Sequence, residues 1–214
     1  MSVIDTLVVV MCKAPVKGLV KTRLAAEIGQ DAALDVYTGM LNYVFEQLHS
    51  ANVHVAVFVE GGELDSSFRG NDTWHFFPQR GSDLGERIVS ALCDAPLAGK
   101  MLVIGTDMPF VDEALLTEAA AALDTADVVI GPCVDGGYYL IGMKHVHGEL
   151  FEDIPWSTSD VLTSTLARCS EHGLTPHLLP LRRDVDTLAD LLALRAPSEE
   201  HADVVDRLLH FARP

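Results

Sequence analysis

Basic residues are scarce in this 214-residue chain. Lysine and arginine together number 15 against 31 aspartate and glutamate residues, which gives a formal net charge of −16 and a pI near 4.7. A chain with this balance repels polyanions, so we expect it to bind neither nucleic acid nor an anionic membrane surface. A small anion held by one locally basic loop stays compatible with the composition.

Cysteine motifs and long apolar runs are also missing. The four cysteines lie far apart and show neither CxxC nor Cys/His ligand spacing. This pattern indicates free thiols in a reducing cytoplasm rather than a disulfide framework or a zinc site. The apolar run at residues 7–11 is much shorter than a membrane span and does not resemble a secretory signal. We therefore expect a cytoplasmic protein without a membrane span.

Hydrophobic residues, in contrast, make up 49% of the chain, enough for a sizeable core. Short β-branched runs alternate with segments of helical periodicity, which predicts an α/β sandwich around a mostly parallel sheet, with residues 1–214 as one domain. Strands are expected at 3–11, 53–59, 74–77, 100–104, 127–131, 138–143 and 176–181. Helices are expected at 31–49, 82–95, 112–123, 159–172, 187–195 and 199–211.

In such sheets, ligands bind at the carboxyl ends of the strands. The loops expected at those ends are 12–23, 78–87, 105–109 and 132–137. The first of them collects the cations that the rest of the chain lacks: Lys13, Lys17, Lys21 and Arg23, shaped into a turn by Pro15 and Gly18. A loop of this kind between a buried strand and a helix favours phosphate binding, although a solvated basic loop would have the same composition.

A single carboxylate follows the strand at 100–104. Asp107 stands in "GTDMP", where the proline prevents the strand from continuing. An acid there can hold a divalent cation that bridges two phosphates, or it can cap the following turn. A second acid is available in "RRDVDTLADL", where Asp184 and Asp186 share one face of an extended segment. Helix capping by Asp186 or Thr187 explains the same letters.

Three further stretches carry polar or aromatic candidates. In "GPCVDGGYYLIG", Asp135 is a candidate base, and two adjacent glycines permit a ligand close to the main chain or form a plain hairpin turn. The stretch "QRGSDLGER" at 79–87 places charges around two glycines, and a capped helix start is the simpler interpretation. Trp156 in "IPWST" is a core or lid aromatic in the simpler interpretation.

With these motifs in order, the chain resembles the bacterial family called transferase 1, radical-SAM/selenodomain-associated, a domain of unknown function grouped with nucleotide-diphospho-sugar transferases of the glycosyltransferase A fold. The likeness is carried by six motifs along nearly the whole chain: "KAPVKGLVKTRLA", "GSDLGER", "IGTDMP", "GPCVDGGYYLIG", "WST" and "DVDTLADL". The resemblance implies a Rossmann-like sheet that binds a nucleotide together with Mg²⁺ or Mn²⁺.

The same resemblance implies roles for individual residues. Asp107 takes the place of the acid in a DxD motif, but Thr106 precedes it where a second acid would stand, so the metal needs Asp186 as a distant ligand. From the residues themselves and the resemblance together, we expect catalytic roles for Lys21, Asp107 and Asp135. Nucleotide and phosphate are expected at Lys13, Pro15, Gly18, Lys21, Arg23, Gly81, Gly85, Arg87 and Asp107, and the substrate at Asp135, Gly136, Gly137, Tyr138 and Trp156.

A second likeness, to phospholactate guanylyltransferases, is carried by "KTRL" and "DVDT..DL". Those enzymes share the fold but attack a nucleoside triphosphate and release pyrophosphate. The expected function is therefore a metal-dependent glycosyltransferase that uses a nucleotide-diphospho-sugar and a small acceptor. Nucleotidyl transfer from a nucleoside triphosphate is the first alternative, and a nucleotide-binding domain without catalysis is the second.

Overall fold

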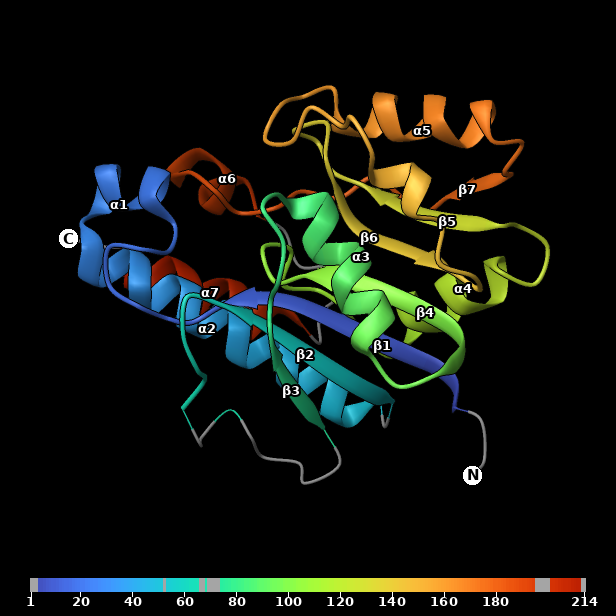
Figure 1. Cartoon of the computed structure of the whole chain (residues 1–214). Helices are drawn as coiled ribbons and strands as arrows, with labels where there is room; N and C mark the ends of the chain where they lie inside the picture. Colours follow the sequence, from blue (N-terminus) through green and yellow to red (C-terminus); the bar gives the residue numbers. More distant parts are fainter. Residues whose placement is uncertain (1–3, 52, 66–67, 69–73, 195–200, 213–214) are drawn as a thin grey trace.

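The computed structural model describes residues 4–51, 53–65, 68, 74–194 and 201–212 and contains one seven-stranded sheet of order β3-β2-β1-β4-β6-β5-β7 (Figure 1). The strands are β1 (Ile4–Lys13), β2 (His54–Glu60), β3 (His75–Pro78), β4 (Ala98–Gly105), β5 (Val128–Pro132), β6 (Tyr138–Met143) and β7 (Pro176–Leu178). The helices are α1 (Thr22–Ile28), α2 (Gln30–Ser50), α3 (Leu84–Asp94), α4 (Glu113–Ala122), α5 (Val161–Glu171), α6 (Leu188–Ala193) and α7 (Ala202–Phe211), with a 3₁₀ turn η2 (Gly148–Phe151).

The sheet is mostly parallel, as the sequence predicts, and the exception is β6. This strand lies antiparallel to both β4 and β5. The connection from β5 to β6 has only five residues, 133–137, whereas a crossover between parallel strands needs about a dozen. The hairpin interpretation of the "DGG" stretch is therefore confirmed.

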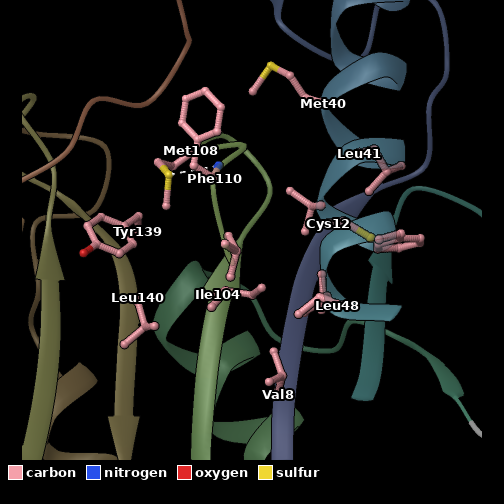
Figure 2. Close-up of a cluster of buried hydrophobic side chains, with 14 of the residues drawn as sticks. Val8, Cys12, Met40, Leu41, Leu48, Ile104, Met108, Phe110, Tyr139 and Leu140 are labelled. Carbon is pink, nitrogen blue, oxygen red and sulfur yellow. Dashed lines mark hydrogen bonds between the residues drawn. The ribbon is translucent and has the colours of Figure 1, made fainter. Parts of the chain in front are cut away.

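Both faces of the sheet are covered, which makes a three-layer α/β/α sandwich. Alternate residues of β1 face opposite sides: Val8 and Val10 pack into one buried cluster, and Leu7 and Val9 into the other. The first cluster takes side chains from α1, α2, α4, α6 and α7, and the second from α3, α5 and η2. Figure 2 shows part of the first cluster, where Val8 and Cys12 of β1 and Ile104 of β4 lie beside α2. Burial on both faces explains the continuous apolar runs of the central strands.

Two elements were not expected from the sequence, α1 and η2. The first begins inside the basic stretch, and Lys21 occupies its N-cap position with a left-handed backbone, φ 46°. Helix α1 buries one residue, Leu24, and has no side-chain cap, so it leaves almost no periodic signal. Of the expected boundaries, residues 3, 195 and 199 lie outside the described part. Within the described residues, no helix has the length and apolarity to cross a membrane.

Candidate active site

A cavity of about 650 Å³ opens at the carboxyl ends of β1 and β4. Its lining draws on all four loops that the sequence predicts to be at this edge, and on two later segments around residues 156 and 185. Among the predicted site residues, those that line it are Lys13, Lys21, Arg23, Arg87, Asp107, Tyr138, Trp156 and Asp186. The volume is in the range usual for small-molecule sites.

Lys21 lies at the centre of the charged groups in this cavity. Its Nζ is 2.5 Å from Oδ1 of Asp107 and 3.0 Å from Oδ1 of Asp186, and its side chain is only 3% exposed. Burial alone would lower the pKa of Lys21, but the two neighbouring carboxylates raise it above the usual value. The ammonium group is therefore charged, and it joins two acids that are 79 positions apart in the sequence.

The backbone around Asp107 is held rigidly. Met108 and Phe110, which follow it, are buried beside β1, β4 and α2, and Figure 2 shows the contact from the Phe110 amide to the Met108 sulfur. The carbonyl of Pro109 accepts a hydrogen bond of 2.5 Å from Nε2 of Gln47 in α2. Asp107 itself is half exposed and projects into the cavity. Its position is thus fixed by buried neighbours while its carboxylate stays accessible.

One backbone hydrogen bond brings the C-terminal acids to Asp107. The amide of Val185 donates to the carbonyl of Asp107 over 2.9 Å, which places Asp184 and Asp186 on either side of that contact. The following helix α6 is capped by Thr187, through a capping box with Asp190. Asp186 is therefore not the cap, and its carboxylate is paired with Lys21 and Arg23 instead.

Asp184 turns toward a different group of residues. One ligand atom each of Cys133, Asp135 and Asp184 lies within 4.8 Å of the others. Burial, then the charges of Asp135 and Asp186, raise the pKa of Asp184 to about 6. Burial also raises the pKa of the Cys133 thiol, so the sulfur stays protonated at neutral pH. The oxygen atoms of the acids, rather than this sulfur, are the donors available here.

The donor set fits a hard divalent cation. Asp107 and Asp186 both lie within 3.0 Å of one ammonium nitrogen, so a single cation can bridge them. Asp184 also lines the cavity and brings a third carboxylate to it. Carboxylate oxygens are the ligands preferred by Mg²⁺ and Mn²⁺. The residues present therefore fit the metal that the motif pattern predicts.

The remaining cations are arranged around the rim. Arg87 is 2.5 Å from Oε1 of Glu60 and also donates to the carbonyl of Gly81, and Lys13 lies 3.7 Å from Glu60. Arg23 is 70% exposed and pairs with Asp186. Lys17 differs from these, because it pairs with the exposed Asp31 and is not in the cavity lining.

Several predicted residues do not line the cavity: Pro15, Gly18, Gly81, Gly85, Asp135, Gly136 and Gly137. Gly136 has φ +92°, and a Cβ there would lie 2.1 Å from the carbonyl oxygen of Ser159. A Cβ on Gly85 would meet the Phe151 carbonyl at 2.7 Å and the Trp156 ring at 2.9 Å. These two glycines allow close packing of the segments that carry the site, and their predicted ligand contacts stay predictions.

The aromatic candidates form one corner of the cavity. Tyr138, at the start of β6, packs edge to face against Trp156 with ring centroids 6.4 Å apart. Both rings line the cavity beside Asp184. This corner combines apolar ring faces with a carboxylate, an arrangement suited to a hydroxylated organic group.

Several residues that line the cavity were not selected as site residues from the sequence, among them Glu60 and Gln79, and Asp184 was named only as a neighbour of Asp186. Asp184 carried a signal, since it is two residues from Asp186 in an extended segment. Glu60 and Gln79 directly follow the apolar residues of β2 and β3, and their position at those strand ends was the available clue.

Comparison with solved structures agrees with this architecture. A structure described as a "putative nucleotide-diphospho-sugar transferase" from Desulfovibrio desulfuricans G20 matches with a TM-score of 0.85 and 28% identity over 96% of this chain and 94% of that one. A nucleotidyl transferase from Methanothermobacter thermautotrophicus matches with a TM-score of 0.61 and 18% identity over 95% and 98% of the two chains. The fold is that of the nucleotide-diphospho-sugar transferases.

A third similar structure was solved with a bound metal ion. Rv0371c from Mycobacterium tuberculosis H37Rv, solved in complex with manganese, matches with a TM-score of 0.54 and 16% identity over 88% of this chain and 97% of that one. No curated protein matches the chain. The family model described as "uncharacterized protein conserved in bacteria (DUF2064)" matches residues 43–158, more than half of the 214 residues. The chain belongs to the DUF2064 family.

Proposed function

We propose that the protein is a metal-dependent glycosyltransferase that takes a nucleotide-diphospho-sugar as donor. The observation that carries the proposal is the group formed by Lys21, Asp107 and Asp186 inside a cavity of nucleotide size. Two carboxylates and a buried cation at the carboxyl ends of β1 and β4 suit a diphosphate and its counterion. The likeness to a nucleotide-diphospho-sugar transferase over nearly the whole chain supports the same choice.

In this proposal, Asp107 and Asp186 would hold Mg²⁺ or Mn²⁺, and the ion would supply positive charge for the diphosphate leaving group. Lys21 contacts both of these acids and Arg23 contacts Asp186, and we propose that both cations donate to phosphate oxygens as negative charge develops on them. Lys13 and Arg87 line the cavity further along β1 and α3 and extend the cationic surface.

The acceptor is proposed to enter at the aromatic corner. The wall there contains Tyr138, Trp156 and Asp184, and no lysine or arginine from β5, β6 or the 156–157 segment is in the cavity lining. A wall with a carboxylate and no cation favours a hydroxyl group over a phosphorylated one. Asp135 does not line the cavity but shares a cluster with Asp184, which does, and it is proposed as the base that receives the hydroxyl proton by way of Asp184.

A panel of nucleotide-diphospho-sugars and nucleoside triphosphates, each with and without Mn²⁺, tests the proposal. Chromatography of the products distinguishes the reactions, because glycosyl transfer releases a nucleoside diphosphate. We expect such a release from one nucleotide-sugar, dependent on metal and lost in Asp107→Asn. Turnover that is unaffected by Asp107→Asn would exclude the proposed site.

Nucleotidyl transfer is the second candidate, and one observation favours it. Four cations, Lys13, Lys21, Arg23 and Arg87, line the cavity, which is ample charge for a triphosphate. Release of pyrophosphate from a nucleoside triphosphate in the same panel would establish this reaction in place of the first. Nucleotide binding that is indifferent to metal, without any turnover, would instead point to a binding domain without catalysis.

A further inference from the structure

We propose that Lys21 fills the metal position in the free protein, so that the site takes a divalent cation only as part of a nucleotide complex. This inference rests on the proposed binding of nucleotide and metal at the site. It adds the condition under which the metal can enter and assigns Lys21 a second role besides its contact with phosphate.

The geometry leaves no room for two cations between the acids. The ammonium nitrogen of Lys21 lies 2.5 Å from one carboxylate oxygen of Asp107 and 3.0 Å from one of Asp186. A Mg²⁺ ion bound to the same oxygens would stand about 2.1 Å from each, which is closer than the ammonium. The ion would therefore have to occupy the space that the ammonium group now holds.

The ammonium group of Lys21 is held in place by burial and by its two carboxylate partners. The Lys21 side chain is 3% exposed, and its left-handed backbone at the start of α1 directs it inward. If the Lys21 ammonium group left the two carboxylates with no other anion nearby, it would become a buried charge without a partner, which is energetically unfavourable. A free metal ion must pay this cost as well as shed its own water, so binding of metal alone is disfavoured.

A nucleotide removes that obstacle. Its phosphate oxygens are anions of the kind that an ammonium group binds well, and they would enter the cavity from the side lined by Lys13 and Arg87. When Lys21 moves to a phosphate, every charge keeps a partner: the ammonium has the phosphate, and the metal has Asp107 and Asp186. The exchange is therefore favourable only when phosphate and metal are present together.

Lys17 provides the matched comparison within the same loop. It lies four residues before Lys21, is 51% exposed and pairs with Asp31, whose side chain is 80% exposed. Replacing Lys17 removes the same charge from the loop without touching the two acids of the cavity. Any effect that is specific to Lys21 therefore stems from its position and not from the charge of the loop.

Binding of Mn²⁺ to the full-length chain, followed by the electron paramagnetic resonance signal of the free ion, tests the inference. For the wild type we expect weak binding of Mn²⁺ alone and at least tenfold tighter binding with a saturating nucleoside diphosphate, the set being UDP, GDP, ADP and CDP. For Lys21→Met we expect Mn²⁺ alone to bind at least about tenfold more tightly than to the wild type, which corresponds to about 1.4 kcal/mol. Lys21→Arg, which keeps the cation, and Lys17→Met should behave as the wild type.

The inference is overturned if wild type, Lys21→Arg and Lys21→Met bind Mn²⁺ alone with equal affinity. Circular dichroism confirms that each variant is folded, and Lys21→Gln replaces Lys21→Met if that variant is not. If no nucleotide changes Mn²⁺ binding to the wild type, the proposed function fails. The comparison of the variants with Mn²⁺ alone still decides whether Lys21 occupies the metal position.

Discussion

The two walls of the cavity differ in charge and in construction. One wall is formed by the parallel strands β1 and β2, the start of α1 and α3, and it carries Lys13, Lys21 and Arg87, with Glu60 between Lys13 and Arg87. The opposite wall, built on the antiparallel β6 and the 156–157 segment, carries aromatic rings and, from the 184–186 segment, carboxylates. In a protein of net charge −16, this separation gathers cations on one wall of the cavity, as the proposed binding of a diphosphate requires.

The largest loss of turnover is expected at Asp186, whose carboxylate contacts both Lys21 and Arg23. Asp186→Asn removes the carboxylate charge that Lys21 and Arg23 share, so turnover should fall by about 10²–10³. Steady-state kinetics with the donor found in the product assay measure it. The matched control is Asp31→Asn, whose carboxylate pairs with Lys17 at the surface and whose turnover should stay near that of the wild type. Equal losses in both variants would mean that the cavity pairing has no special importance.

The packing of the Trp156 ring depends on Gly85 in α3. In Gly85→Ala, the new methyl group would overlap the Trp156 ring and the Phe151 carbonyl, so we expect a loss of about 1–3 kcal/mol in the free energy of unfolding. Urea denaturation, together with the change in tryptophan fluorescence, measures it. Gly148→Ala is the control, because a Cβ there meets nothing within 4 Å. An unchanged stability in Gly85→Ala would show that α3 and Trp156 are not packed as described.

The smallest effect concerns the contribution of Asp184 to the stability of the fold. The pKa of Asp184 is raised from 3.8 to about 6, so between about pH 4 and 6 the folded protein keeps a proton that the unfolded chain has lost. Asp184 therefore costs stability as the pH rises through this window, and Asp184→Asn should be the more stable protein at pH 7. Because the group is partly exposed, we expect about 1 kcal/mol, or a few degrees in Tm.

Thermal unfolding at pH 4 and pH 7 checks this sign. The advantage of Asp184→Asn should be present at pH 7 and nearly absent at pH 4, where the folded protein keeps the proton and the unfolded chain has lost it only in part. An advantage that is equal at the two pH values would contradict the assigned cause.

Much of the fold was readable from the sequence because buried strands leave continuous apolar runs. The strand predicted at residues 138–143 has the observed bounds, and that at 100–104 lies within β4. The direction of β6 was not settled, because the "DGG" letters suit both a hairpin and a ligand loop. Helix α1 was missed, since a seven-residue helix with one buried side chain has almost no periodicity.

The site was predicted less completely than the fold. The density of cations pointed to a loop that lines the cavity, but nothing in the sequence separates Lys17, which pairs at the surface, from Lys21, which is buried between two acids. That distinction comes from the left-handed backbone at Lys21 and from the contact of Val185 with Asp107, both of them tertiary features. The sequence also does not reveal why a glycine is needed at a given position. Ligand contacts were expected at Gly85 and Gly136, and the structure shows that neighbouring segments pack closely against both.

The pairing of Lys21 with Asp186 joins residues 165 positions apart. During synthesis, the loop with Lys21 leaves the ribosome long before the segment that carries Asp186 has been made. A nascent chain therefore already has its basic loop, the central strand β1 and Asp107, but it lacks Asp186, the second acid that pairs with the buried lysine. The site proposed for metal and nucleotide is therefore complete only when nearly nine-tenths of the chain exists, so synthesis itself sets the moment at which the proposed binding can begin.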